Sequence, residues 1–542
     1  MSVDLPSGET LLNEPTLNKG TAFTAEERQR YGLEGLLPPA IETLDRQLER
    51  VLHHLDAKPN DLERYIYLTG LADRNETLFF RTIMSDPNRF IPIVYDPTVA
   101  DACLAFGHIF RRARGLYLTR DRKAHFAQIL RHWPMQDVRF ICVSTGGRIL
   151  GLGDIGANGM GIPIGKLQLY TACAAVPPHQ LLPVLLDIGT TNEALRADPL
   201  YLGLRETPPS DDEVDEVADA FVEAANEVYP GVCIHFEDWK GTDAMRLLER
   251  YRDKILCYND DIQGTSAIVV AGLTTALQIK REKFADQRVL FYGAGSAGLG
   301  IANMIVSAMQ LEGLSEEAAR SRIAMMDING LLVTARDDLN TWQRPFAREV
   351  EPASDLLEVV RWFKPTALIG VSTHGGAFTE AVVREMAKLN RQPIIFPISN
   401  PTDRAECSAA QAYHWTGGSA LFAAGVQFED VELKGKSLHP GQANNFYIFP
   451  AIGLAVYATK PKRITTEMFI HAARAVADQV DQGARDRGML FPLQTDILET
   501  EVTTAVRVAD HIFDRGQAGV ERPVDVRAWL EKLLYKPEYL PL

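Results

Sequence analysis

The sequence predicts a multidomain α/β protein in which parallel sheets follow a helical N-terminal region, and three observations carry this prediction. The chain has 542 residues, which is too long for a single hydrophobic core. Residues 232–265 contain two strand-like runs, VCIHF and ILCY, on either side of a helix pattern over 242–254. Residues 288–311 place a glycine-rich turn between a strand and an apolar helix. Strand, helix and strand in this order form parallel β-α-β units.

Residues 24–90 are predicted to be helical. Thr24 and Glu27 have the spacing of a capping box. A stripe at helical spacing follows, which is typical of core or subunit packing: Leu44, Leu48, Val51, Leu52 and Leu55. The next run, FIPIV over 90–94, is predicted to be a strand that ends at Tyr95. Tyr95 is either a packing residue or, if it faces a carboxylate edge, a candidate acid.

Residues 139–144 and 149–152 are predicted to form two strands around a Thr-Gly-Gly turn, with Arg148 at the start of the second. A glycine-dense loop then leads to Lys166, which is expected to open an apolar helix. The helix dipole disfavours a lysine cation at that end. Burial near other cations would lower its pKa towards the range of a general base. A surface lysine is the alternative, but this loop and helix favour a functional one.

Pairs of acids follow both strand-like runs of the central unit. Glu237 and Asp238 end the first run, and Asp260 and Asp261 end the second. Because parallel strands end at one edge of a sheet, the four carboxylates are expected to lie together, where open α/β sheets bind ligands. A single acid at a strand end usually only solvates a turn. Two pairs at one edge favour a site for Mg²⁺ or Mn²⁺, which prefer oxygen ligands.

The strand over 288–292 runs into a GxGxxG turn and an apolar helix, which is the context of a Rossmann-like domain that binds NAD or NADP. The cofactor-binding candidates in the turn are Gly293, Gly295, Ser296, Ala297 and Gly298. The next strand ends in Asp327, where an acid can bind the ribose hydroxyls of the adenosine. Predicted strands over 367–371 and 394–398 end in small polar residues, including Asn400. Asn445 either caps the apolar segment after it or holds a carboxylate.

Composition narrows the class of protein. The net charge of −15 argues against a general nucleic-acid binder, whose footprint is basic. The six cysteines form no CxxC pair and most lie in apolar runs, as in a reduced cytoplasmic protein. The first residues have neither a basic start nor an apolar segment of a signal peptide. No uninterrupted apolar run approaches the ~20 residues of a membrane span, so we expect a cytoplasmic enzyme without a membrane or nucleic-acid partner.

With these residues placed, the chain resembles the malic enzyme family along nearly its whole length. The matching stretches are YDPTV, RILGLGD, GMGIPIGKL, HFEDW, YNDDIQGT, GAGSAGLGIA, ISNPT and NNFYIFP. The resemblance implies an oxidoreductase that converts L-malate to pyruvate and CO₂ with NAD or NADP and with Mg²⁺ or Mn²⁺. It also implies a homodimer or homotetramer.

The resemblance also implies a role for each matching residue. Glu237, Asp238 and Asp261 correspond to the metal ligands. Lys166 corresponds to the general base, Asp260 to its partner in the proton network, and Tyr95 to the general acid. The implied substrate contacts are Arg148, Asn400 and Asn445.

One motif departs from the family pattern. Residues 95–99 read YDPTV, where malic enzymes commonly have YTPTV, and the YDPT form is similar to malolactic enzymes, which release lactate. Malolactic activity is therefore the first alternative, and a catalytically silent nucleotide-binding relative is the second. The choice between NAD and NADP stays open, because Asp327 would repel a 2′-phosphate while Arg336 or Arg344 could compensate.

Four parts of the chain are expected. Residues 1–113 form the N-terminal helical domain, and residues 114–262 form the catalytic α/β domain that binds malate and metal. Residues 263–445 form the Rossmann-like domain. Residues 446–542 form helices that return to the catalytic domain, followed by a surface tail.

Overall fold

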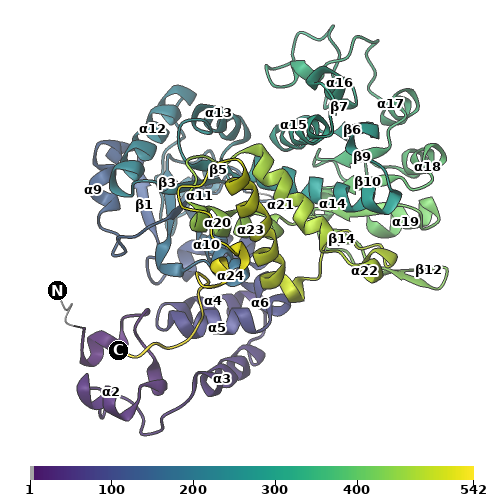
Figure 1. Ribbon diagram of the computed structural model, residues 1–542. Helices are drawn as coiled ribbons and strands as arrows, with labels where there is room; N and C mark the ends of the chain where they lie inside the picture. Colours follow the sequence, from purple (N-terminus) through teal and green to yellow (C-terminus); the bar gives the residue numbers. More distant parts are fainter. Residues whose placement is uncertain (1–4, 150) are drawn as a thin grey trace.

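The computed structural model describes residues 5–149 and 151–542 (Figure 1). Its N-terminal part is helical as far as residue 109. The capping box is present: Thr24 accepts from the Glu27 amide, and the Glu27 side chain accepts from the Thr24 amide. The helices are α1 (Gly8–Leu12), α2 (Ala25–Arg30), α3 (Leu44–Asp56), α4 (Asp61–Ala72), α5 (Glu76–Ser85), α6 (Pro87–Val94), α7 (Thr98–Leu104) and α8 (Phe106–Ile109).

The strand predicted over 90–94 is wrong, because these residues belong to helix α6. Asp86 caps this helix by accepting from the Arg89 amide, and Pro87 occupies its first turn. A short apolar run fits a buried strand and a buried helix equally well, and here the cap and the proline decide for the helix. Tyr95 therefore follows the end of a helix rather than the end of a strand.

The first sheet is parallel, with strand order β1-β3-β2-β4-β5. Its strands are β1 (Leu116–Thr119), β2 (Phe140–Ser144), β3 (Leu181–Asp187), β4 (Cys233–Glu237) and β5 (Cys257–Asn259). The helices between them are α9 (Phe126–Leu130), α10 (Gly161–Ala174), α11 (Glu193–Ala197), α12 (Asp211–Val228) and α13 (Gly241–Tyr251). The strand predicted over 149–152 is not found in the described residues: Ile149 makes only an isolated bridge to Gly153, and residue 150 lies outside them.

The second sheet has the order β14-β11-β10-β9-β6-β7-β8 and is parallel except for β8, which confirms the Rossmann-like domain. Its strands are β6 (Val289–Tyr292), β7 (Ile323–Asp327), β8 (Gly330–Leu331), β9 (Ala367–Gly370), β10 (Ile394–Pro397), β11 (Leu421–Ala424) and β14 (Gly441–Gln442), and a hairpin of β12 (Val431–Leu433) and β13 (Lys436–Leu438) lies outside it. The helices are α15 (Ser296–Leu311), α16 (Glu316–Arg320), α17 (Leu356–Phe363), α18 (Glu380–Leu389) and α19 (Ala409–Thr416).

Helix α14 (Thr265–Lys280) joins the two sheet regions. Together with the π-helical turn η5 (Asp260–Gly264) it is long and apolar enough to cross a membrane. However, 72% of its most apolar stretch is buried inside the molecule. It packs against α15 and against α21. Its apolar character is therefore explained by its place in the core.

The C-terminal helices pack on the first sheet region rather than on the second alone. They are α20 (Phe449–Thr459), α21 (Thr466–Asp478), α22 (Gln482–Asp486), α23 (Ile497–Asp514) and α24 (Val526–Glu531). Helices α20 and α23 both contact α10, and Figure 1 shows them, in yellow, beside it. The helix that carries Lys166 is thereby enclosed by chain from both ends of the sequence.

The prediction of a surface tail after α24 is wrong in part, because the last residues bind the N-terminal helices. The Tyr539 hydroxyl donates to Gln47 Oε1 at 2.7 Å and accepts from Asn75 Nδ2 at 2.7 Å. The Tyr535 ring packs edge-on against Phe80. Aromatic side chains with a polar tip suit such half-buried contacts.

We predict that Tyr539→Phe weakens the docking of the tail by about 1–3 kcal/mol, because it removes the hydrogen-bond partner of Gln47 Oε1 and of Asn75 Nδ2. Hydrogen–deuterium exchange should report this as faster exchange in α3 and α5. Tyr67→Phe on α4 is the matched control, since the Tyr67 hydroxyl makes no side-chain hydrogen bond within the described residues. Equal exchange rates in the Tyr539 variant and the wild type would contradict the role of this contact.

Candidate active site

Three carboxylates meet at the C-terminal edge of the first sheet. Glu237 is the last residue of β4, Asp238 follows it, and Asp261 lies in the π-helical turn η5 after β5. One oxygen from each lies within 4.8 Å of the others. Asp238 has φ of 53°, a left-handed conformation that is uncommon for residues other than glycine. Residues with such strained backbones cluster at functional sites. The Asp238 amide donates to Asp261 Oδ2 at 2.9 Å, which fixes the distance between the two acids.

The electrostatics of this cluster suit a bound cation. Burial raises the pKa of Asp238 and of Asp261 well above the ordinary range, and the negative charge of neighbouring acids, Glu237 among them, raises both further. A divalent cation between the three carboxylates would remove this repulsion. Since each donor is an oxygen, the residues present fit Mg²⁺ or Mn²⁺. Glu237, Asp238 and Asp261 would hold the ion.

Lys166 is 1% exposed and lies beside this cluster. Its Nζ is 2.5 Å from Asp260 Oδ2 and 3.0 Å from Glu237 Oε1. The expected position at a helix N-terminus is wrong: α10 begins at Gly161, so Lys166 lies in its second turn. The low pKa was expected beside other cations, whereas the structure places Lys166 between two acids. Burial lowers the pKa of Lys166, but the charges of Asp260 and Glu237 outweigh burial and raise it well above its ordinary value.

Tyr95 and Phe449 enclose the ammonium group of Lys166. The Nζ lies 5.4 Å from the centre of the Tyr95 ring and 4.5 Å from the centre of the Phe449 ring. Gly165 makes this packing possible, because a Cβ there would lie 2.8 Å from Tyr95 Cδ2. Burial raises the pKa of the Tyr95 hydroxyl well above its ordinary value, which keeps it protonated.

The three predicted substrate contacts lie in different places. Asn445 Nδ2 donates to Asp260 Oδ2 at 2.5 Å, which joins it to the Lys166 cluster. The side chain of Arg148 is exposed and makes no ion pair within the described residues, and its Nη1 lies near Gly241, which in turn faces Ser296 of α15. Asn400 lies three residues after the end of β10, with a buried Oδ1 that has no hydrogen-bond partner in the described part of the chain. No hydrogen bond joins Asn400 to the four acids within the described residues.

A buried network below the carboxylates was missed in the sequence. His235 Nε2 is 2.8 Å from Glu237 Oε2, and His235 Nδ1 is 2.9 Å from the Tyr258 hydroxyl and 3.1 Å from that of Tyr170. All three side chains are fully buried. His235 and Glu237 are two residues apart on β4 and therefore point to the same face of the sheet, which is the signal that could have revealed the pair.

The glycine-rich turn of the second sheet has little room. A Cβ at Gly293 would lie 2.5 Å from the Val371 carbonyl oxygen, and one at Gly298 would lie 2.5 Å from that of Gly293. Both positions therefore require glycine, as a turn that brings a pyrophosphate to a helix N-terminus does. Asp327 ends β7 as predicted, but both its oxygens accept from Arg336, at 2.8 Å each.

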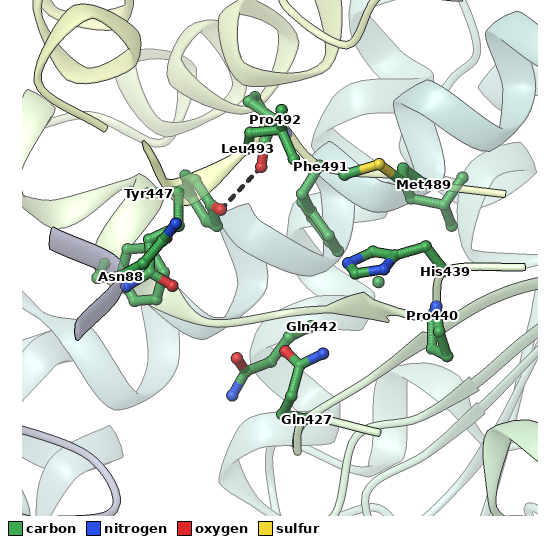
Figure 2. Close-up of a pocket in the computed structure, with 14 residues that line it drawn as sticks. Asn88, Gln427, His439, Pro440, Gln442, Tyr447, Met489, Phe491, Pro492 and Leu493 are labelled. Atoms are coloured by element: carbon green, nitrogen blue, oxygen red, sulfur yellow. Dashed lines mark hydrogen bonds between the residues drawn. The ribbon is translucent and has the colours of Figure 1, made fainter. Parts of the chain in front are cut away.

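A cavity of about 240 Å³ lies among residues of the segment after β13, the turn before α20 and the segment before α23 (Figure 2). Phe446, Tyr447, Phe491 and His439 line it, and the Tyr447 hydroxyl donates to the Pro492 carbonyl. None of the carboxylates of the cluster lines this cavity. It is therefore a separate feature from the carboxylate site.

The fold and the site define an α/β enzyme with one dinucleotide-binding sheet and one acid-rich sheet edge. Residues 72–252 match the profile described as "Malic enzyme, N-terminal domain", and residues 262–513 match "Malic enzyme, NAD binding domain". The chain belongs to the malic enzyme family.

Relatives over the full length agree with this assignment. The chain is 46% identical to the NADP-dependent malic enzyme of Anas platyrhynchos, over 98% of this chain and 96% of the relative. It is 45% identical to the mitochondrial NAD-dependent malic enzyme of Ascaris suum, over 98% and 83% of the two chains. Both relatives are named malic enzymes, so the comparison does not favour the malolactic alternative.

Solved structures share the fold. The malic enzyme of Entamoeba histolytica superposes with a TM-score of 0.58 at 20% identity, covering 95% of this chain and 92% of that one. The malic enzyme of Pyrococcus horikoshii gives 0.55 at 22% identity, covering 82% and 88%. At this identity the likeness supports the architecture.

We predict that Asp261→Asn weakens Mn²⁺ binding roughly tenfold or more, since even indirect partners of metal ligands have effects of that size. Titration calorimetry on the purified protein measures it without turnover. Wild-type affinity should also rise with pH above the ordinary aspartate range, because Asp238 and Asp261 hold their protons to a higher pH and must release them to bind the ion.

Asp212→Asn, at an exposed acid in the first turn of α12, is the matched control and should bind Mn²⁺ as the wild type does. An Asp261 variant with unchanged affinity would remove this residue from the ligand set.

Proposed function

We propose that the protein catalyses the oxidative decarboxylation of L-malate to pyruvate and CO₂, with reduction of NAD or NADP and with Mg²⁺ or Mn²⁺ as the metal. One observation carries the proposal: a fully buried lysine lies between Asp260 and Glu237, at the edge where Glu237, Asp238 and Asp261 meet. A buried base beside a cation site is what the removal of a hydroxyl proton needs.

When bound, the divalent cation would polarise the C2 oxygen of malate, and the oxidised dinucleotide would accept the hydride from C2. Lys166 takes the proton of the C2 hydroxyl. For this it must be neutral, whereas the charges of Asp260 and Glu237 raise its pKa. A cation held by Glu237 would offset one of these two charges and so favour the neutral lysine.

Tyr95 supplies the proton at the end of the reaction. Once CO₂ has left, C3 of the enol of pyruvate must be protonated, and a buried tyrosine that keeps its proton can donate it. The ammonium group of Lys166 lies against the Tyr95 ring, so the base of the first step is placed to restore the proton. Arg148 is assigned to a malate carboxylate, and Asn445 and Asn400 to the substrate amide contacts.

The dinucleotide is assigned to Gly293, Gly295, Ser296, Ala297, Gly298, Asp327 and Asn400. The pairing of Asp327 with Arg336 neutralises the acid that would repel a 2′-phosphate. We therefore keep NAD and NADP as parallel candidates, and the relatives named above include both kinds.

The proposal also includes an oligomeric state and a compartment: the protein forms a homodimer or homotetramer in the cytoplasm. The exposed apolar side chains of Leu104, Phe110, Leu200 and Leu202 support association, because such residues are usually covered. Gly107 packs against the backbone of Leu200, which places the two segments together. The six free, buried cysteines support a reducing compartment.

We predict that Lys166→Ala lowers kcat for malate oxidation about 100-fold or more, the size expected for loss of a general base. Reduced dinucleotide should still bind, as measured by its fluorescence. Lys254→Ala, at an exposed lysine of the same sheet region, is the control. Normal oxidation by the Lys166 variant would remove this lysine from the mechanism.

The direct test is an assay of purified protein with L-malate, Mn²⁺ and either NAD or NADP. We expect one pyruvate and one reduced dinucleotide per turnover. Lactate without net reduction would instead identify malolactic activity and give weight to Asp96. Binding of the dinucleotide and the metal without turnover would support the silent relative.

A further inference from the structure

A fully buried carboxylate outside the acid cluster lies beside the carboxyl ends of β9 and β10 in the second sheet. Glu406, between β10 and α19, is 0% exposed. Its Oε1 accepts from the Ser372 amide at 2.9 Å, from the Ser372 hydroxyl at 2.7 Å and from the Ser399 hydroxyl at 2.6 Å. Its Oε2 has no partner within the described residues. Burying a carboxylate costs free energy, which hydrogen bonds must offset. Three donors on one oxygen of Glu406 provide this and hold the donor groups in place.

These hydrogen bonds join the chain segments that follow two neighbouring strands. Ser372 is the second residue after β9, and Ser399 is the second residue after β10. Ser399 also accepts from the Thr373 amide at 2.9 Å, and Thr373 has a left-handed φ of 57°. Glu406 and Ser399 together therefore determine the path of the loop after β9.

The strand order places these loops at the nicotinamide side of the dinucleotide site. Strand β6 carries the glycine turn, with β7 and Asp327 on one side and β9 and β10 on the other. In this fold the acid after the second strand binds the adenosine ribose, so the opposite half of the dinucleotide extends over β9 and β10. Asn400, the residue after Ser399, lies at the same edge.

The same network touches the pyrophosphate turn. A Cβ at Gly293 would lie 2.9 Å from the Ser372 amide nitrogen, so the turn rests directly on the residue that Glu406 holds. Gly370, the last residue of β9, has the Glu406 carboxyl carbon 2.3 Å from its Cβ position. The space for Glu406 thus exists only because Gly370 has no side chain.

We propose that Glu406 is a positioning residue for the dinucleotide, which acts through Ser372 and Ser399 to hold the glycine turn and the Asn400 loop in the shape that binds the nicotinamide half. This inference rests on the proposed dinucleotide chemistry. It adds a residue that touches neither the cofactor nor the substrate.

The test measures the Kd of reduced dinucleotide by fluorescence, together with the KM for dinucleotide and the KM for malate. Glu406→Met keeps the volume and removes the acceptor. We expect its Kd and its dinucleotide KM to rise about tenfold, the effect of losing hydrogen bonds that order a site. The malate KM should change less. Glu406→Gln, which keeps one acceptor oxygen, should restore the Kd to within about threefold of the wild type.

Glu501→Met is the matched control, because Glu501 is equally buried on α23 and makes no hydrogen bond to the sheet edge. Its Kd should stay within about twofold of the wild type. A folded Glu406→Met protein with an unchanged Kd would overturn the proposal. If that variant does not fold, Ser399→Ala takes its place, and an unchanged Kd there overturns the proposal equally. Failure of the wild type to bind dinucleotide would instead refute the proposed function.

Discussion

The structure depends on the charge imbalance around Lys166. Glu237, Asp238, Asp260 and Lys166 are buried at the edge of the first sheet, and Asp261 is half-buried beside them. A buried charge is tolerated only with a partner. Lys166 can pair with two of the acids, Asp260 and Glu237, which leaves Asp238 and Asp261 with raised pKa values. A further positive charge at this edge would offset the remaining repulsion, which is why the proposed function assigns a divalent cation to Glu237, Asp238 and Asp261.

The elements around this edge make the imbalance possible. Helix α10 carries Lys166, and the π-helical turn η5 carries the adjacent residues Asp260 and Asp261. A π-turn allows a helix to begin directly at a functional site. Phe449 of α20 closes the opposite side of the lysine, so a residue from the C-terminal helices completes the enclosure. In the proposed mechanism, this enclosure keeps water from the proton that Lys166 takes.

Much of this could be predicted from the sequence, because periodicity and turn chemistry are local. The parallel units around Glu237 and Gly293 follow from apolar runs of strand length and from a glycine turn in its proper context. Residues 90–94 were misassigned, since a five-residue apolar run has no period that separates helix from strand. The predicted start of α10 is too late, because Gly161 and Gly165 are required by close packing against Cys103 and Tyr95 rather than by a loop. Glu406 lies in an irregular segment, and its role depends on contacts between distant strands that no local pattern encodes.

The attachment of the last residues to the N-terminal helices has a consequence for how the molecule is made. The two hydrogen bonds of Tyr539 join positions 464 and 492 residues apart. During synthesis, helices α3 and α5 leave the ribosome long before this tyrosine exists. Gln47 Oε1 and Asn75 Nδ2 can therefore bind Tyr539 only after almost all of the other helices have been synthesised, and this part of the packing forms late.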